Sequence, residues 1–241
     1  MLERAQIESA SDIAERELFD AIVDGRLLPG APLRLKDLAE QLGTSMMPVR
    51  EAIGRLAALD LVEIEPRKGA RVRELTLKDL EDTYFTRLHL ETLAVWEAAQ
   101  HFTAEDSTKA SQALVDRETA QAAGDRMAAR DAHERFHFVI YEASGRTWLV
   151  RSILPGWRNS ERYREGGPHE PSELAERSTE HQQLLAALIR GDGEEAVRWM
   201  VTHLTTSVRL AASHLDGQAE VELSLPTAED LLHGYAVSKL S

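Results

Sequence analysis

The sequence predicts a mainly α-helical protein, with an N-terminal winged helix-turn-helix joined to a C-terminal antiparallel bundle of about six helices. Two observations carry this prediction. Residues 35–75 form two helical patterns around Gly43, followed by two short alternating stretches that a basic turn joins. Beyond residue 76 the apolar residues recur at helical spacing and few segments alternate with period two, so no sheet is expected there.

The N-terminal elements follow from local signals. An amphipathic helix is expected over residues 7–24. Gly43 allows a sharp turn between the next two helices, because glycine adopts positive φ without a steric cost. Ser45 is placed to cap the second of these helices, and Pro48 lies in its first turn, where a missing N–H does little harm. The apolar residues of that helix should face the core: Val49, Ile53, Leu56 and Leu59.

The segment after Asp60 predicts a hairpin. The runs LVEI and ARVRE alternate, and the turn PRKG between them carries Arg67 and Lys68. Arg50 and Arg55 lie off the apolar stripe of the preceding helix. A buried stripe, two exposed arginines and a basic hairpin tip indicate a winged helix-turn-helix, which sets one helix in the major groove of DNA.

Thr76 can cap a new helix, so we place the domain boundary there. The expected domains are residues 1–75, 76–216 and a tail of unknown role at 217–241. Helices of the second domain are expected at 76–102, 105–123, 125–143, 146–162, 171–190 and 193–215. The charged stretch 159–165 should be a solvated face. The tail, with a weak strand-like piece at 221–225 and a short helical pattern, should lie beyond the bundle.

Composition excludes several classes of protein. The chain has 241 residues, enough for one large core or two modest ones, and no cysteine, which excludes disulfides and thiol catalysis. No apolar run approaches a membrane span and the N-terminus is charged, so we expect a cytoplasmic protein without a membrane partner. The net charge is −13, but residues 1–73 hold 11 Lys/Arg and 13 Asp/Glu, so most of the acidic excess lies outside the winged motif.

Four histidines suggest a metal site. His133 and His137 share one helix face, His181 shares a face with leucines, and His203 flanks the apolar stripe of the last bundle helix. Neutral imidazoles in a bundle core suit zinc, nickel and similar divalent ions. The alternative for each is a hydrogen-bonded core histidine. HERFH also matches the zinc-protease pattern HExxH, which would make the chain a zinc hydrolase with Glu134 as general base, although a fourth histidine would crowd the metal.

Residues 21–33 together with 35–75 resemble the DNA-binding domain of the GntR superfamily of bacterial regulators. The resemblance implies DNA contacts from the start of the recognition helix, its arginine, the wing tip and a basic residue of the preceding helix. At these positions stand Lys36, Ser45, Met46, Met47, Arg50, Arg67, Lys68 and Gly69. Many relatives have arginine and threonine in place of Met46 and Met47. Because methionine cannot bond guanine through two hydrogen bonds, the operator should differ from the usual one.

HERFHFVIYEASG and the stretch HQQLLAALIRGDGEEAVRWMVTHL resemble the FCD effector-binding domain of the FadR-type branch. That domain commonly holds a metal through an Asp-x-x-x-His pair and two later histidines. His137, His181 and His203 match three of these positions, and His133 stands where an aspartate or asparagine is usual. Imidazole in place of carboxylate raises the charge of the site by one, so the pocket favours anions more strongly, or else His133 does not ligate.

Arg87 stands where relatives have an inward arginine near the ligand, so the FCD resemblance implies an effector clamp that binds a carboxylate through two hydrogen bonds. The alternative is a surface ion pair with Glu91, one turn away on the same helix.

These features predict a metabolite-responsive transcription regulator, by resemblance a repressor. The expected partners are double-stranded DNA with a near-palindromic operator, a small organic acid, and a second copy of the chain in a homodimer. Zinc is the expected metal, with nickel or another transition metal as alternatives. Two competing functions are the zinc hydrolase and a metal-free bundle that binds an apolar effector.

Overall fold

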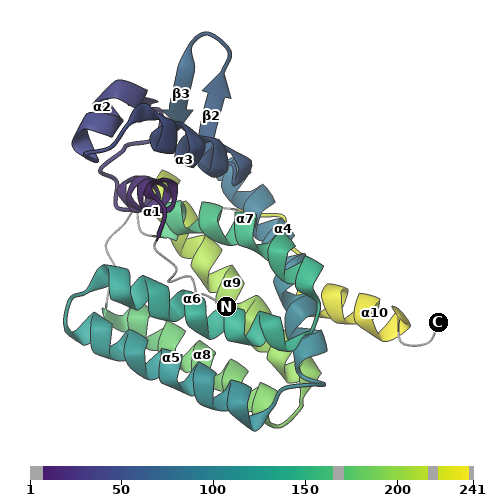
Figure 1. Ribbon diagram of the computed structural model, residues 1–241. Helices are drawn as coiled ribbons and strands as arrows, with labels where there is room; N and C mark the ends of the chain where they lie inside the picture. Colours follow the sequence, from purple (N-terminus) through teal and green to yellow (C-terminus); the bar gives the residue numbers. More distant parts are fainter. Residues whose placement is uncertain (1–7, 165–170, 217–221, 239–241) are drawn as a thin grey trace.

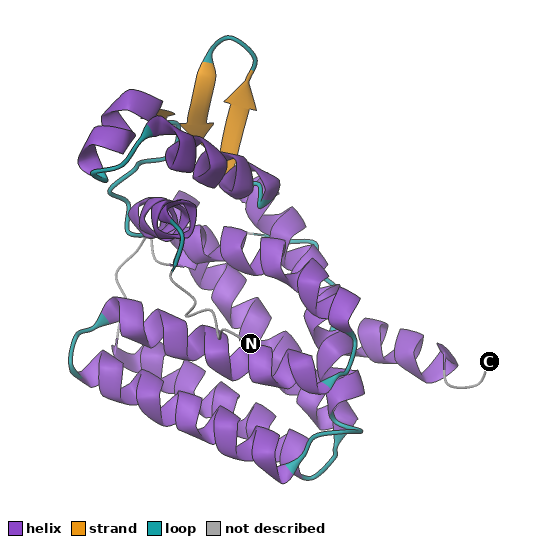
Figure 2. Ribbon diagram, in the orientation of Figure 1, coloured by secondary structure: helices purple, strands orange, loops and turns teal. Residues whose placement is uncertain are grey.

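The computed structural model describes residues 8–164, 171–216 and 222–238. These ranges contain ten helices and one three-stranded sheet, and the sheet is confined to the N-terminal part of the chain (Figures 1 and 2). The mainly α class and the winged motif joined to a helical bundle are therefore confirmed. No helix within the described ranges combines the length and the apolar composition that a membrane crossing needs.

The N-terminal part, called the head below, packs three helices against a small sheet. Its elements are α1 (Ala10–Val23), β1 (Pro32–Leu33), α2 (Leu35–Gln41), α3 (Met46–Ala58), β2 (Val62–Glu65) and β3 (Gly69–Val72). The strands are antiparallel in the order β1-β3-β2, with Val62 opposite Val72 and Leu33 opposite Ala70. Side chains from all three helices and the sheet form one apolar cluster, separate from that of the bundle.

Most local predictions for the head hold. Gly43 has a φ of 62°, as the sharp turn requires. Val49, Ile53 and Leu56 are buried, while Leu59 is half-buried because it lies at the helix end. Ser45 occupies the N-cap position, but its side chain makes no capping hydrogen bond, contrary to the prediction. The reason lies in Pro48, which takes the third helical position and supplies no N–H for the serine oxygen to accept.

The bundle contains six helices and a seventh that packs on its outside. They are α4 (Leu77–Ala98), α5 (Ala104–Ala122), α6 (Arg126–Ala143), α7 (Thr147–Arg164), α8 (Pro171–Ile189), α9 (Gly193–Asp216) and α10 (Ala228–Ser238). Thr76 caps α4 by accepting a hydrogen bond from the Asp79 N–H, as predicted. α4 packs against α6, α7 and α9, and α5 lies along α6 (Figure 1). The core includes the fully buried rings of Tyr84, Phe136 and Trp157.

The predicted solvated face at 159–165 is wrong for the described part of that stretch. Asn159 to Arg164 are all buried, and Glu165 lies outside the described residues. The cause is the place of α7, which packs against α4 and α9 on the bundle side and against α1 of the head. Tyr163 donates to an Asp79 oxygen at 2.6 Å, and Arg162 donates to the backbone oxygen of Arg73 at 2.9 Å. These bonds satisfy buried polar groups and join Arg73, just after β3, and Asp79 of α4 to α7.

The tail also differs from expectation. It does not lie beyond the bundle, because Leu231 and Leu232 of α10 are buried against α4 and α9 and belong to the bundle core. The Tyr235 hydroxyl lies 2.7 Å from the hydroxyl of Thr92 on α4. The expected strand-like piece forms no strand over residues 222–225, because no strand edge is there to pair with, and Val221 lies outside the described residues.

Candidate metal centre and DNA-binding head

The four predicted histidines converge inside the bundle. His133 and His137 come from α6, His181 from α8 and His203 from α9, and all four are buried. The Nε2 atom of His137 lies 3.1 Å from those of His133 and His181, which are 3.2 Å from each other. One ligand atom from each of the four histidines lies within 4.8 Å of the others.

These separations suit a shared metal ion. Zinc–nitrogen bonds of about 2.0–2.1 Å place neighbouring nitrogens about 2.9 Å apart in octahedral and about 3.4 Å apart in tetrahedral coordination. The 3.1–3.2 Å triangle of Nε2 atoms falls between these limits. The all-nitrogen donor set therefore fits a divalent transition metal, with His203 as the fourth member of the group.

Burial keeps all four imidazoles neutral. It is the largest of the influences that hold the pKa of each of these histidines well below its ordinary value. The charge of Arg164 adds to the lowering of the pKa of His133, and the nearby His203 adds to that of His181. A neutral imidazole is the form that binds a metal, so no imidazolium has to lose its extra proton before the cluster ligates at neutral pH.

Two of the histidines present the tautomer that a metal requires. Tyr141 donates its hydroxyl hydrogen to Glu91 at 2.6 Å, so its oxygen accepts the Nδ1–H of His137 at 3.1 Å. His203 donates from Nδ1 to a carboxylate oxygen of Glu180 at 2.9 Å. In both rings the proton on Nδ1 leaves the Nε2 lone pair free.

The other two histidines face guanidinium groups instead. Nη1 of Arg164 lies 3.2 Å from Nδ1 of His133, and Nη1 of Arg117 lies 3.2 Å from Nδ1 of His181. A guanidinium only donates, so Nδ1 must accept in both contacts and the ring proton sits on Nε2. A metal on Nε2 of either ring is therefore incompatible with that ring's arginine contact.

Arg87 is inward, and the surface ion pair considered for it is wrong. Both Arg87 and Glu91 are buried, with Arg87 donating through Nε at 2.6 Å and Nη2 at 3.2 Å to the two carboxylate oxygens. Nη1 of Arg87 donates to Ser160 at 2.8 Å. Glu91 in turn accepts from Tyr141, so Arg87 reaches the histidine cluster through this chain of hydrogen bonds.

Sequence reasoning missed four residues that touch the cluster. They are Arg117, Arg164, Tyr141 and Glu180. Only Tyr141 had a local signal, since it follows His137 by one helical turn on α6.

Glu134 is not placed to act as the general base on a metal-bound water. Its carboxylate pairs with Arg158 of α7 at 2.9 Å and is about three-quarters buried. A general base for HExxH chemistry must reach the metal-bound water rather than sit in a separate ion pair.

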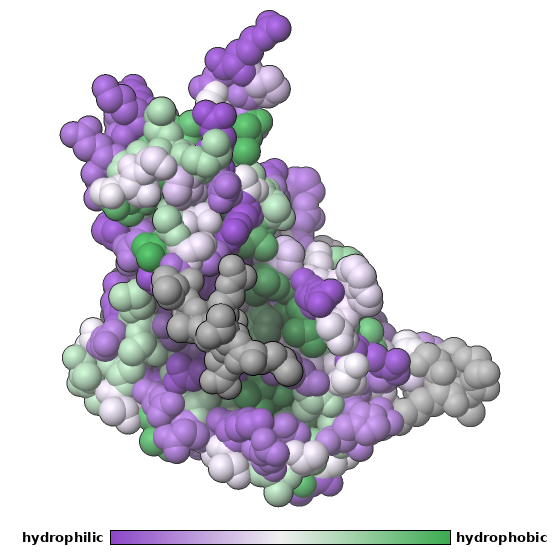
Figure 3. Space-filling model, viewed as in Figure 1, coloured by the Kyte–Doolittle hydropathy of each residue, from purple (hydrophilic) through white to green (hydrophobic). Residues whose placement is uncertain are grey.

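The residues expected to contact DNA are all exposed. They are Lys36, Ser45, Met46, Met47, Arg50, Arg67, Lys68 and Gly69. Arg67 and Gly69 have φ angles of 67° and 99° in the turn at the wing tip, which projects from the molecule as a hydrophilic point (Figure 3). Arg55 is occupied elsewhere, because it donates to Asp12 at 2.7 Å and Glu15 at 2.9 Å and so ties α3 to α1.

A winged helix-turn-helix carried on a helical bundle is the architecture of a DNA-binding transcription regulator. Residues 10–72 match the family model described as bacterial regulatory proteins of the gntR family, and residues 82–206 match the FCD domain. The chain belongs to the GntR family, in the FadR-type branch that carries an FCD domain.

Similar proteins agree. The HTH-type transcriptional regulator McbR of Escherichia coli is 33% identical over 187 residues, which cover 75% of this chain and 82% of McbR. A probable D-xylose utilization operon transcriptional repressor of Paenarthrobacter nicotinovorans is 41% identical over 133 residues, covering 54% and 58% of the two chains. The solved structure of E. coli McbR/YncC superposes with a TM-score of 0.76 at 28% identity, covering 87% of this chain and all of that one. The chain is therefore a regulator and not an enzyme, and the hydrolase alternative has no support.

Proposed function

We propose that this regulator is a homodimeric repressor whose affinity for a near-palindromic operator is set by a divalent metal and a small carboxylate bound at the histidine cluster. The observation that carries the proposal is the triangle of Nε2 atoms from His133, His137 and His181, with sides of 3.1–3.2 Å. Zinc is the expected ion, and nickel is the alternative. Since His133 belongs to this triangle, we propose it as a ligand beside His137, His181 and His203.

The charge around the cluster favours an anionic effector. Arg87, Arg117 and Arg164 are buried around the four neutral imidazoles, and a divalent ion would add two further positive charges. Buried positive charge is costly unless an anion pairs with it. Glu91 and Glu161 already pair with Arg87 and Arg164, so the charge left to balance is chiefly that of the metal and Arg117. A small carboxylate that ligates the metal would supply the anion, whereas an apolar effector would not.

Arg87 is our candidate for direct effector contact. Three of its N–H groups are used by Glu91 and Ser160, and a guanidinium has five, so two remain for a carboxylate. Any ligand that acts through this site must favour one placement of the head over another, since equal affinity for both would change nothing.

The operator contacts are proposed from exposure and family position. Lys36 and Arg50 would neutralise phosphates or read bases from the two helices, and Arg67 and Lys68 would extend the contact from the wing tip. We propose residues 1–75 as the DNA-binding domain and 76–216 as the effector domain. The tail at 217–241 would act as an outer support of the bundle through α10.

Metal analysis tests the proposal directly. Purified wild-type protein should contain about one divalent ion per chain, and the double variant His137→Ala with His181→Ala should contain none. The exposed pair His101→Ala with His214→Ala is the matched control and should keep the ion. A wild-type protein without metal, or a double variant that retains it, would overturn the metal centre.

DNA binding tests the regulatory half. The wild-type protein should select a near-palindromic duplex from a random library, and one or more members of a panel of small mono- and dicarboxylates should weaken binding to it. The double histidine variant should bind the same duplex without responding to any carboxylate. A carboxylate response that survives in that variant would place the effector elsewhere.

A further inference from the structure

Three charged residues on α7 form a continuous ladder, in which Glu161 and Arg164 are buried and Arg158 is half-buried. Arg158, Glu161 and Arg164 follow one another at three-residue spacing, so they lie along one face of the helix. The two oxygens of Glu161 lie 3.5 Å from Nη1 of Arg158 and 3.5 Å from Nη2 of Arg164. Glu161 is completely buried, so its charge depends on these two arginines.

The two ends of the ladder touch different parts of the molecule. At one end Arg164 faces Nδ1 of His133, inside the histidine cluster, at 3.2 Å. At the other end the guanidinium of Arg158 lies 4.7 Å from the ring centre of Phe19, which belongs to α1 of the head. The ladder therefore runs from a proposed metal ligand to the DNA-binding part of the chain.

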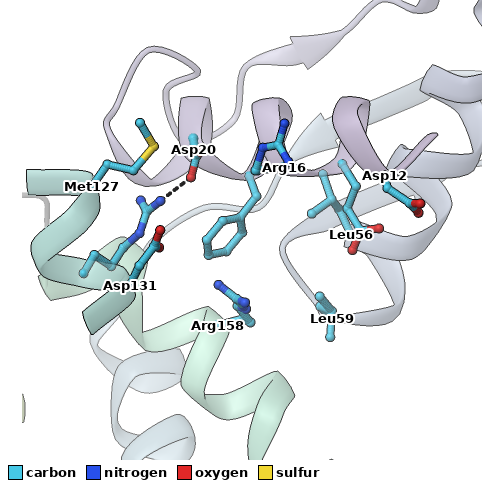
Figure 4. Close-up of a pocket in the computed structure, with 11 residues that line it drawn as sticks. Asp12, Arg16, Asp20, Leu56, Leu59, Met127, Asp131 and Arg158 are labelled. Carbon is cyan, nitrogen blue, oxygen red and sulfur yellow. Dashed lines mark hydrogen bonds and ion pairs between the residues drawn. The ribbon is translucent and has the colours of Figure 1, made fainter. Parts of the chain in front are cut away.

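The junction at Phe19 is held by charge and is incompletely filled. Arg130 of α6 also lies over the Phe19 ring, at 5.5 Å, and pairs with Asp20 of α1. A pocket of about 250 Å³ opens beside this contact. Figure 4 shows α1 on one side of it, with Asp20 and Arg16, and Arg158 with Asp131 of the bundle on the other. The pocket leaves space beside Phe19 between α1 and the bundle.

We propose that the Arg158–Glu161–Arg164 ladder couples occupancy of the histidine site to the placement of the head. The inference rests on the proposed metal centre and adds to it a route for regulation. Arg164 responds to metal binding at His133, and Glu161 is shared between the two arginines. Arg158 of α7 makes the contact with α1.

The coupling follows from the proton on His133. In the present contact Nδ1 accepts from Arg164, so the proton is on Nε2. When Nε2 ligates a metal, that proton passes to solvent and another is taken up at Nδ1, so the ring stays neutral. An N–H then faces a guanidinium that can only donate, and Arg164 must move away.

When Arg164 moves away from His133, its guanidinium can pair with Glu161. Oε1 of Glu161 and Nε of Arg164 are both buried without a hydrogen-bond partner, so a full ion pair between these side chains would satisfy both. Glu161 drawn toward Arg164 is drawn away from Arg158, whose other carboxylate partner, Glu134 at 2.9 Å, lies on α6. The Arg158 guanidinium then shifts toward Glu134, and its contact with Phe19 loosens. Metal binding should thus free α1 while it stiffens the helices that hold the ligands.

Hydrogen–deuterium exchange on the full-length protein, with and without Zn²⁺, separates these effects. Zinc should slow amide exchange in α6 and α8 and speed it in α1 by at least about threefold. Slower exchange in α6 and α8 with unchanged or slower exchange in α1 would overturn the coupling and leave the metal centre standing. No bound zinc and no change in any helix would overturn both.

Substitutions at Arg158 and Phe19 test whether the effect of zinc reaches α1 through the ladder. Arg158→Gln should keep zinc stoichiometry and the slowing in α6 and α8, but reduce the zinc response of α1 to less than about a third of the wild-type change. Arg151→Gln is the matched control, because Arg151 is exposed on the same helix and stacks on the exposed Trp148 rather than on α1. Phe19→Leu changes the other side of the contact, should show the same loss, and replaces Arg158→Gln if that variant does not fold. A full zinc response of α1 in either folded variant would overturn the route.

Discussion

The four imidazoles are chemically distinct because different groups hold their outer nitrogens. Tyr141 and Glu180 accept from His137 and His203, which fixes the tautomer that a metal needs. Guanidinium groups hold His133 and His181 in the opposite tautomer. Acceptors behind a ligating histidine raise its basicity and orient it, so His137 and His203 should be the preformed half of the centre.

The Tyr141 hydroxyl should therefore matter for metal affinity. Tyr141→Phe removes the acceptor for His137 Nδ1–H while Glu91 keeps its pair with Arg87, so zinc affinity should fall about 10–100-fold. Tyr84→Phe is the control, since Tyr84 is equally buried but its hydroxyl has no partner. Competition with a chromophoric chelator measures both, and equal affinities would show that the hydroxyl has no such role.

The pH dependence of stability should report the same four residues in metal-free protein. Their pKa values are lowered on folding, so unfolded chains bind protons near pH 6.5 while the folded chain does not. Above about pH 6.5 these histidines do not reduce the free energy of unfolding, because they are neutral in both the folded and the unfolded chain. This free energy should fall as the pH drops further, by roughly 1 kcal/mol per histidine and pH unit.

Two buried acids oppose this trend. Burial raises the pKa of Glu161 to about 7 and raises the pKa of Glu180 above its ordinary value, so both residues favour the folded state as the pH falls from 7 toward 4.5. The four histidines outweigh the two acids, and urea midpoints of chelator-treated protein should decrease from pH 7 to pH 5. The double variant of His137 and His181 should show a shallower decrease, and a flat wild-type profile would contradict the lowered pKa values.

For the secondary-structure elements, the sequence predicted those features that depend on neighbouring residues in the chain. Helical spacing and capping residues such as Thr76 predicted the helices to within a few residues of their ends. The spacing of His133 and His137 likewise predicted one shared face. The burial of α7 could not be predicted, because it depends on packing against α4, α9 and α1, which are distant in the sequence. Arg117 and Arg164 were missed for the same reason, since their histidine partners lie on other helices.

α3 is the element expected to read DNA, and Arg50 tests it. Arg50 is exposed one turn into the helix, so Arg50→Ala should weaken binding to the library-selected duplex by at least about tenfold, as loss of a good base contact does. Lys109→Ala is the control, because Lys109 is an exposed basic residue on α5, at the far end of the molecule from α3 (Figure 1). Fluorescence anisotropy at one fixed salt concentration measures both, and equal affinities would remove Arg50 from the interface.

At the scale of the whole molecule, charge is divided unequally. Residues 1–73 carry a net charge of −2, and the rest of the chain carries −11. The head can approach DNA because local positive charge lies at the wing and on exposed α3, but the acidic bundle adds no attraction. One head offers few phosphate contacts, so a single subunit should bind weakly. Two heads on one near-palindrome would restore affinity, because the second binding event becomes intramolecular.

Half-sites test this reasoning. A duplex with one half of the selected sequence should bind at least about 100-fold more weakly than the full site, since the gain from joining two binding events is lost. A duplex with the two halves moved apart by five base pairs should bind as weakly as the half-site, because half a helical turn puts the second half on the opposite face of DNA. Analytical ultracentrifugation should find two chains on the full site. Equal affinity for full and half-sites, or one chain on the full site, would show that a single head suffices, and the ladder on α7 would then regulate one head by itself rather than the spacing of two.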